Sequence, residues 1–232
     1  MTLPNPINVD SPVSVPPQGH ESSELGAALT FLLEGGVVAL PTDTLFGLAA
    51  DVTNERALER IFDIKGRPPE MALPVLVANW HQVRDVARVE STAARKLASK
   101  FWPGSLTLVL PRQPNLSTLV TGGRESVAVR MPDHWVPLWL SSQLGRPITG
   151  TSANRSGQPD LKTSKEVNDL LGDAVDTIIA AGPAPLGLQS TIVDLTGPIP
   201  VLLRDGAIPF AQVSQAWEEL AGLQAETKGT GG

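Results

Sequence analysis

The chain alternates between stretches with helical and strand-like spacing of hydrophobic residues. Four apolar residues recur at helical spacing over 25–32, after a serine pair at 22–23 that can cap a helix. Gly35-Gly36 then ends the pattern, and the apolar run 37–40 fits a buried strand that leads into the polar loop 41–44. The N-terminal part therefore predicts a helix, a strand and a polar loop.

The same alternation continues along the chain. A second helix is predicted between a cap at Asn54 and a terminating glycine at Gly66. Further helices are predicted over 91–100, 135–144, 164–171 and 210–220, and further strands over 73–78, 105–110, 126–131, 147–149, 176–180, 190–195 and 201–204. Strands that alternate with helices in this way predict an α/β or α+β domain with a mixed sheet.

Domain organisation follows from the two ends of the chain. Residues 1–20 are rich in proline and have little apolar periodicity, so we expect a flexible tail. Residues 223–232 are small, polar and rich in glycine, so we expect a disordered end. No linker between these ends is long enough to divide the core, and residues 21–222 are predicted to form one domain.

Composition agrees with a single globular unit in the cytoplasm. The chain has 232 residues, of which 41% are hydrophobic, enough for one sizeable core. It contains no run of about 18 apolar residues and no basic-then-apolar signal peptide, so we expect a cytoplasmic protein without a membrane partner. Cysteine is absent, which excludes disulfides, thiolate nucleophiles and sulfur-ligated zinc.

Charge and missing motifs exclude several function classes. A net charge of −6 argues against a protein that coats nucleic acid, although it does not exclude a local basic cleft. The chain contains no P-loop, no dinucleotide-binding glycine motif, no zinc-protease motif and no nucleophile elbow.

Polar loops at the predicted strand ends are the candidates for chemistry, because ligands bind at strand ends in α/β sheets. Each also has a structural interpretation. Lys65 and Arg67 fit cations at a helix C-terminus, and Arg130, which faces away from the Val127 and Val129 pair, fits a solvated surface. The segments around Ser152 and Asn154 and around 42–44 are rich in residues that favour tight turns. Ser190 also fits an ordinary strand residue, and Arg204 fits a surface turn.

Taken together, these loops hold four cations and several hydroxyl groups, with no histidine, cysteine or carboxylate pair. Lysine binds phosphate as a point charge, and arginine binds carboxylate or phosphate as a planar fork. The set therefore favours a nucleotide or phosphate site over acid–base hydrolysis.

Seven sequence blocks carry a resemblance to a known family. They are PTDTLFGL, KGRP, WPGSLTLVL, VAVRMP, TSANRSGQP, QSTIVD and LLRDG, and they occur in this order between about Gly35 and Gly206. The order resembles the YrdC-like family of L-threonylcarbamoyladenylate synthases, whose hallmark is the K-x-R and S-x-N pair. The resemblance implies a twisted mixed sheet flanked by helices around a concave basic cleft. With few residues after Gly206, the chain resembles the short, single-domain form.

The resemblance also implies roles for individual residues. Those that match the ATP side are Lys65, Arg67, Met71, Ser126, Ser152, Asn154 and Arg204, with Met71 acting through its backbone. Those that match the L-threonine side are Thr44, Arg130, Gly150 and Ser190. Lys65, Arg67, Ser152 and Asn154 are the expected catalytic set, and no residue is expected to be a dedicated metal ligand. Some family members have NPLIVH after K-x-R where this chain has MALPVL at 71–76, which leaves side-chain contacts there in doubt.

The implied reaction joins L-threonine, bicarbonate and ATP into threonylcarbamoyl-AMP and pyrophosphate, with Mg²⁺ bound to the phosphates, for the N6-threonylcarbamoyladenosine modification of tRNA. We expect Arg130 to clamp the threonine carboxylate, and Asp43 and Asp194 to order their own loops through short-range backbone hydrogen bonds. Expected partners are the tRNA threonylcarbamoyl transferase complex and, weakly, tRNA. The alternatives are a non-catalytic RNA-binding module and a carbamoyl-adenylate domain of the hydrogenase-maturation type.

Overall fold

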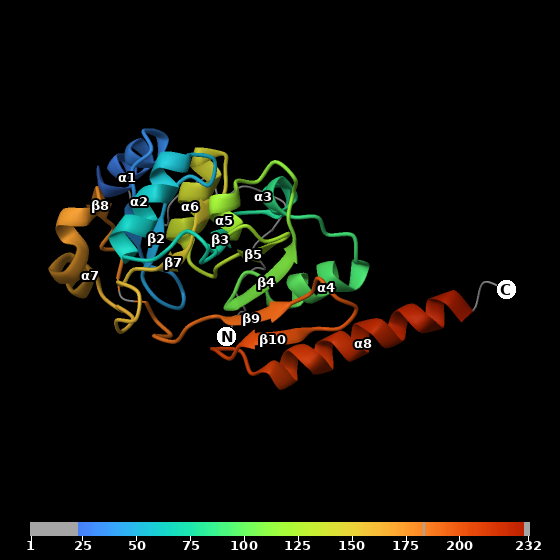
Figure 1. Cartoon of the computed structure of the whole chain (residues 1–232). Helices are drawn as coiled ribbons and strands as arrows, with labels where there is room; N and C mark the ends of the chain where they lie inside the picture. The colour runs from blue at the N-terminus through green and yellow to red at the C-terminus, as the bar shows by residue number, and fades with distance from the viewer. Residues whose placement is uncertain (1–22, 183, 230–232) are drawn as a thin grey trace.

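A computed structural model describes residues 23–182 and 184–229. The predicted flexible tail, residues 1–20, lies outside this range. Two β-sheets and eight α-helices make up the described part, so the predicted mixed α/β fold is confirmed, with two sheets where we predicted one (Figure 1).

The smaller sheet has four strands in the order β7-β2-β1-β8. These strands are β1 (Val38–Leu40), β2 (Gly47–Ala49), β7 (Thr151–Ser152) and β8 (Thr177–Ile178). β1 pairs antiparallel with β2 and parallel with β8, and β2 pairs antiparallel with β7. Segments that are far apart in the sequence therefore meet at the polar loop after β1.

The larger sheet has six strands in the order β10-β9-β4-β5-β3-β6. They are β3 (Val75–Leu76), β4 (Leu106–Pro111), β5 (Ser126–Arg130), β6 (Ile148–Thr149), β9 (Thr191–Asp194) and β10 (Val201–Arg204). The pairs β3·β5 and β4·β9 are parallel and the other pairs are antiparallel. An isolated antiparallel bridge between Asp51 and Ile148 connects the two sheets.

The helices surround the sheets (Figure 1). They are α1 (Ser23–Leu33), α2 (Glu55–Lys65), α3 (Trp80–Val86), α4 (Thr92–Phe101), α5 (Thr118–Thr121), α6 (Trp135–Leu144), α7 (Ser164–Leu171) and α8 (Phe210–Gly229), with a 3₁₀ turn at Gly172–Ala174. α1 packs against α6 and β8, and α4 packs against α8. In Figure 1 the C-terminal half of α8 extends beyond the sheet.

Local signals in the sequence explain where α2 begins and ends. The Asn54 side chain accepts a hydrogen bond from the backbone N–H of Ala57, which satisfies one of the free donors at the helix start. Gly66 adopts a left-handed conformation with φ of 59° and donates its N–H to Asp63. Because this glycine reverses the chain at the end of α2, Lys65 and Arg67 lie on either side of a sharp turn.

Two hydrophobic clusters form the core. The larger one joins α2, α4 and the inner strands of the large sheet, with Leu58, Leu108 and Val129 among its fully buried members. The smaller one joins α1 and α6 across β1 and includes Leu32 and Leu140. These clusters leave the polar strand ends between the two sheets as the place for a site.

Four short elements were not predicted: α3, α5, β2 and β7. β7 has two residues and α5 has four, too few to show a period. The last helix also differs from the prediction, because α8 continues to Gly229, beyond the expected end at 220 and into the expected disordered end at 223–232. The residues at 223–228 are mostly good helix formers, which explains the extension. Among the described residues, no helix combines the length and hydropathy that crossing a membrane requires.

Candidate functional site

A cleft of about 240 Å³ opens between the two sheets. It brings together the loop after β1, the turn after α2, the end of β5, the β6–β7 turn, the start of β9 and the end of β10. Seven predicted site residues line it, namely Thr44, Arg67, Arg130, Gly150, Ser152, Ser190 and Arg204. Residues from both predicted substrate sides thus share one cavity.

Four predicted residues do not line the cleft. Lys65 and Asn154 contact Ser152 from the side away from the cleft, Lys65 through the Ser152 carbonyl oxygen and Asn154 through the Ser152 hydroxyl. Met71 is exposed next to Ala72, which does line the cleft. Ser126 begins β5 opposite Pro111, at the other end of that strand from Arg130.

Lys65 is buried, with 3% of its surface exposed, and its ammonium group has three acceptors within the protein. Its Nζ donates to the carbonyl oxygens of Ser152 at 2.5 Å and Asn154 at 2.8 Å, and to the side-chain oxygen of Asn154 at 3.0 Å. Burial, and then the nearby charge of Arg67, lower the Lys65 pKa to about 7, against an opposing effect of Asp160. Lys65 therefore ties the end of α2 to the loop that carries the S-x-N pair.

Arg67 lines the cleft with part of its hydrogen-bonding capacity unused. Its Nη2 donates to the Ala72 carbonyl at 3.3 Å, and its guanidinium lies 5.6 Å from the centre of the Phe62 ring. Its Nε is buried and has no hydrogen-bond partner among the described residues. Burial lowers the Arg67 pKa, so this guanidinium is a desolvated cation that can accept an anionic ligand.

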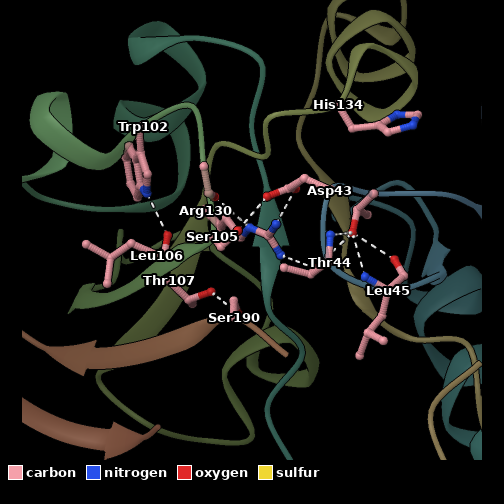
Figure 2. Close-up of polar contacts among 12 residues, drawn as sticks. Asp43, Thr44, Leu45, Trp102, Ser105, Leu106, Thr107, Arg130, His134 and Ser190 are labelled. Atoms are coloured by element: carbon pink, nitrogen blue, oxygen red, sulfur yellow. Dashed lines mark hydrogen bonds and ion pairs between the residues drawn. The ribbon is translucent and has the colours of Figure 1, made fainter. Parts of the chain in front are cut away.

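Arg204 contacts Ser190 and so joins the two predicted substrate sides. Its Nε and Nη2 donate to the Ser190 carbonyl at 3.0 and 2.9 Å, and Nη2 also reaches the Ser190 hydroxyl at 2.9 Å. The hydroxyls of Ser190 and Thr107 share a hydrogen bond of 2.8 Å (Figure 2). Ser190 thus has a polar partner on each side and is not an ordinary strand residue.

Arg130 is buried, with 5% of its surface exposed, which decides against a solvated surface position. Its Nε donates to the Gly104 carbonyl at 2.9 Å and its Nη1 to the Thr44 hydroxyl at 2.8 Å. Its Nη2 forms an ion pair with Asp43 (Figure 2). Burial lowers the Arg130 pKa and Asp43 opposes this effect, so the carboxylate keeps the guanidinium charged inside the protein.

The backbone of the loops that hold these side chains is itself ordered. The Thr42 hydroxyl accepts from the N–H groups of Thr44 and Leu45 at 3.1 and 3.2 Å, which confirms the predicted turn. Gly150 lines the cleft through its backbone, because a Cβ there would lie 2.4 Å from Leu76. This close approach explains why glycine occupies that position.

Three aspartates outside the predicted site differ in the partners of their carboxylates. Asp43 was expected to make short-range backbone hydrogen bonds, and the structure contradicts this, because its carboxylate bonds to Arg130 and Ser105 across the fold. For Asp194 the expectation is confirmed, since it accepts from the N–H and hydroxyl of Thr196. Asp160 accepts from Gln189 at 2.7 Å. Burial lowers the pKa of both Lys65 and Arg204, and the charge of Asp160 opposes this effect.

Cations therefore dominate the side of the cleft around Arg67 and Arg204, while the Arg130 side is balanced by acids. Asp133 also faces the Arg130–Asp43 pair, and burial together with Asp43 raises its pKa. His134 caps α6 by accepting from the Val136 N–H at 3.2 Å, and burial lowers its pKa. Within residues 23–182 and 184–229, no three acidic, histidine or cysteine side chains are grouped as metal ligands.

Comparison with protein families and curated sequences places these features in context. The Sua5/YciO/YrdC family model, described as "Telomere recombination", matches residues 30–206. Threonylcarbamoyl-AMP synthase of Pyrococcus abyssi is 39% identical over 200 residues, which cover 86% of this chain and 59% of the relative. Threonylcarbamoyl-AMP synthase of Bacillus subtilis is 40% identical over 191 residues, which cover 82% of this chain and 55% of the relative. The chain thus spans less than two thirds of the length of either relative.

A solved structure agrees with the sequence relatives. The crystal structure of P. abyssi Sua5 complexed with L-threonine matches with a TM-score of 0.80 and 40% identity, over 83% of this chain and 56% of that one. A shorter relative, a putative threonylcarbamoyl-AMP synthase of Mycobacterium tuberculosis, is 35% identical over 84% of this chain and 90% of its own length.

Proposed function

Because this chain belongs to the Sua5/YciO/YrdC family, we propose that it is an L-threonylcarbamoyladenylate synthase acting on L-threonine, bicarbonate and ATP. The observation that carries the proposal is the shared cleft, in which Arg67 and Arg204 lie beside the buried Arg130 and Thr44. Desolvated guanidinium groups bind phosphate and carboxylate by charge-assisted hydrogen bonds. A cleft with two such regions suits a reaction that joins a phosphate ester to an amino acid.

The chemistry requires positioning more than proton transfer. The threonine amine and bicarbonate form a carbamate and release water. A carbamate oxygen then attacks the α-phosphorus of ATP in line, and the bond from that phosphorus to the bridging oxygen of the β-phosphate breaks to release pyrophosphate. The attacking oxygen is already anionic, so the reaction needs no dedicated base.

Within this proposal Arg67 and Arg204 hold the triphosphate, because both residues line the cleft. Ser152 contributes its hydroxyl, which donates to the Asn154 side chain at 2.7 Å. Arg130 binds the threonine carboxylate, with Thr44 and Ser190 beside it. Lys65 acts from behind the cleft by holding the S-x-N loop in place.

Mg²⁺ enters this proposal as part of the MgATP substrate. The described residues offer no group of three potential ligands for an all-protein site, and Mg²⁺ commonly keeps several waters while it bridges phosphates. Its charge would offset the negative charge of the triphosphate during displacement. The protein then has only to receive a complex that forms in solution.

The remaining parts of the proposal concern the product. A mixed anhydride of this kind is reactive, so we infer hand-over to the tRNA threonylcarbamoyl transferase complex in the cytoplasm. Direct tRNA binding is expected to be weak, since the chain has a net charge of −6.

Pyrophosphate release by the purified chain with MgATP and bicarbonate tests the proposal. Release should depend on L-threonine and should be low without amino acid, with L-serine as the specificity comparison. A folded chain that binds ATP yet releases no threonine-dependent pyrophosphate would overturn it. A tRNA gel shift that disappears in Lys65→Met and Arg67→Ala variants of such an inactive chain would favour an RNA-binding module instead.

A further inference from the structure

The WPGS segment (residues 102–105) connects α4 to β4 and contributes no side chain to the lining of the cleft. Two hydrogen bonds, made by Trp102 and by Gly104, fix the position of the segment. The Trp102 indole N–H donates to the Leu106 carbonyl at 2.7 Å, which closes the segment on itself (Figure 2). The Gly104 N–H donates to the Met131 carbonyl at 2.8 Å, directly after the end of β5. The segment is therefore held against the strand that carries Arg130.

Gly104 lies where a side chain cannot. A Cβ at this position would approach the Phe101 carbonyl oxygen to 2.4 Å, so the backbone can take this path only without a side chain. The path directs the Gly104 carbonyl at Arg130, whose Nε donates to it at 2.9 Å. This hydrogen bond restricts the rotation of the guanidinium plane.

The next residue acts on the other end of the guanidinium through Asp43. The Ser105 hydroxyl donates to Asp43 Oδ2 at 2.8 Å, and Asp43 Oδ1 pairs with Arg130 Nη2. Both partners are buried, with 7% of Ser105 and 5% of Asp43 exposed. Asp43 does not line the cleft, so its carboxylate is directed at Arg130 and not at a ligand.

We propose that Asp43 and the WPGS segment are positioning residues that orient the Arg130 guanidinium for the carboxylate of the amino-acid substrate. This inference rests on the proposed function and adds residues that act through Arg130 without touching the substrate. Arginine binds a carboxylate bidentately only when its plane is correctly oriented. Three protein acceptors, the Gly104 carbonyl, the Thr44 hydroxyl and Asp43, fix that plane before the substrate arrives.

The variants Ser105→Ala and Asp43→Asn test the proposal in two steps of severity. S105A removes only the hydroxyl that orients Asp43, and D43N keeps the shape of the side chain but removes its charge. We expect the KM for threonine to rise about fivefold in S105A and about tenfold or more in D43N, as expected for the loss of one neutral and one charged hydrogen bond. The KM for ATP should stay within about twofold, because the phosphate side does not depend on Asp43.

Two matched variants control for general loss of stability. Ser141→Ala removes a fully buried hydroxyl that lies 2.6 Å from Gln82 Oε1 and 3.0 Å from the Arg146 carbonyl oxygen. Asp51→Asn neutralises an equally buried carboxylate, which pairs with Arg146 at 3.0 Å. Neither Ser141 nor Asp51 lines the cleft, so both control variants should lower the melting temperature without changing the KM for threonine.

The outcomes separate this inference from the proposed function. An active wild-type chain with a raised threonine KM in S105A and D43N, and in neither control, supports the positioning role. Unchanged threonine KM in S105A and D43N beside an active wild type overturns it, as does an equal rise in the KM for ATP. Absence of threonine-dependent pyrophosphate release in every protein counts against the proposed function, and this inference falls with it.

Discussion

Two cations of the candidate site, Lys65 and Arg130, are buried within the protein. Each is surrounded by acceptors from distant parts of the chain. Sequence patterns identified both as site residues but assigned them exposed or terminal positions as alternatives. Partners such as Asn154 and Asp43 could not be inferred because they lie 89 and 87 positions away.

The lowered pKa of Lys65 leads to a prediction about proton uptake on ATP binding. Its pKa of about 7 leaves the amine partly neutral at pH 7.5, and a polyphosphate nearby favours the charged form and raises that pKa. ATP binding at pH 7.5 should therefore take up protons, measured by calorimetry in two buffers of different ionisation enthalpy. The variant Lys65→Met should lose this uptake. A binding enthalpy that is the same in both buffers would contradict the assignment.

Replacement of Arg130 by lysine gives the second prediction. Lysine keeps the charge but cannot reach Gly104, Thr44 and Asp43 at once, and it cannot bind a carboxylate bidentately. The KM for threonine should rise by roughly tenfold or more, and the KM for ATP should change little. Steady-state kinetics with each substrate varied in turn decide this. Equal effects on both substrates would remove Arg130 from the threonine side.

At the level of secondary structure, the ends of the elements position the site. The turn after α2 carries Lys65 and Arg67, and the WPGS segment between α4 and β4 holds Arg130. The caps and periodicity of α2 were readable from the sequence because they depend on neighbouring residues. The strand pairings were not, since β2 meets β7 across a hundred positions and that contact depends on tertiary structure.

The left-handed turn at Gly66 leads to a prediction about the stability of the end of α2. Its φ of 59° is unfavourable for any residue with a Cβ. A Cβ added to Gly66 would have no neighbouring atom within 4 Å, so the cost of Gly66→Ala is conformational and not steric. We expect the free energy of unfolding to fall by about 1 kcal/mol. Gly26→Ala is the matched control, because Gly26 is exposed within α1, also has free space around it, and should gain stability by about 0.5–1 kcal/mol. Denaturant unfolding that shows the same sign for both variants would refute this.

In the whole molecule, each of the two sheets contributes different residues to the cleft. The small sheet presents the loop with Thr44, the large sheet presents Arg130 and Ser190, and the cleft lies between them. The order of seven sequence blocks pointed to the family, but only the fold shows that Arg204 and Ser190 are in contact. That contact joins the two proposed substrate regions, which the sequence analysis assigned to separate sides.

Removal of residues 1–20 gives a prediction for the whole chain. Every residue assigned a role here lies between Asp43 and Arg204, so the shortened chain should keep threonine-dependent pyrophosphate release with kcat/KM within about threefold of the full chain. A larger loss of kcat/KM with an unchanged melting temperature would assign the N-terminal segment a part in the reaction.

If this cleft joins threonine, bicarbonate and ATP in one product, the carbon of bicarbonate must appear in that product. Mass spectrometry of a rapidly quenched reaction with isotopically labelled bicarbonate tests this. We expect a threonine-dependent adenylate that contains the labelled carbon, and its loss in Arg130→Lys at low threonine. Formation of an adenylate without label, or of no adenylate at all by a folded chain that binds ATP, would contradict it.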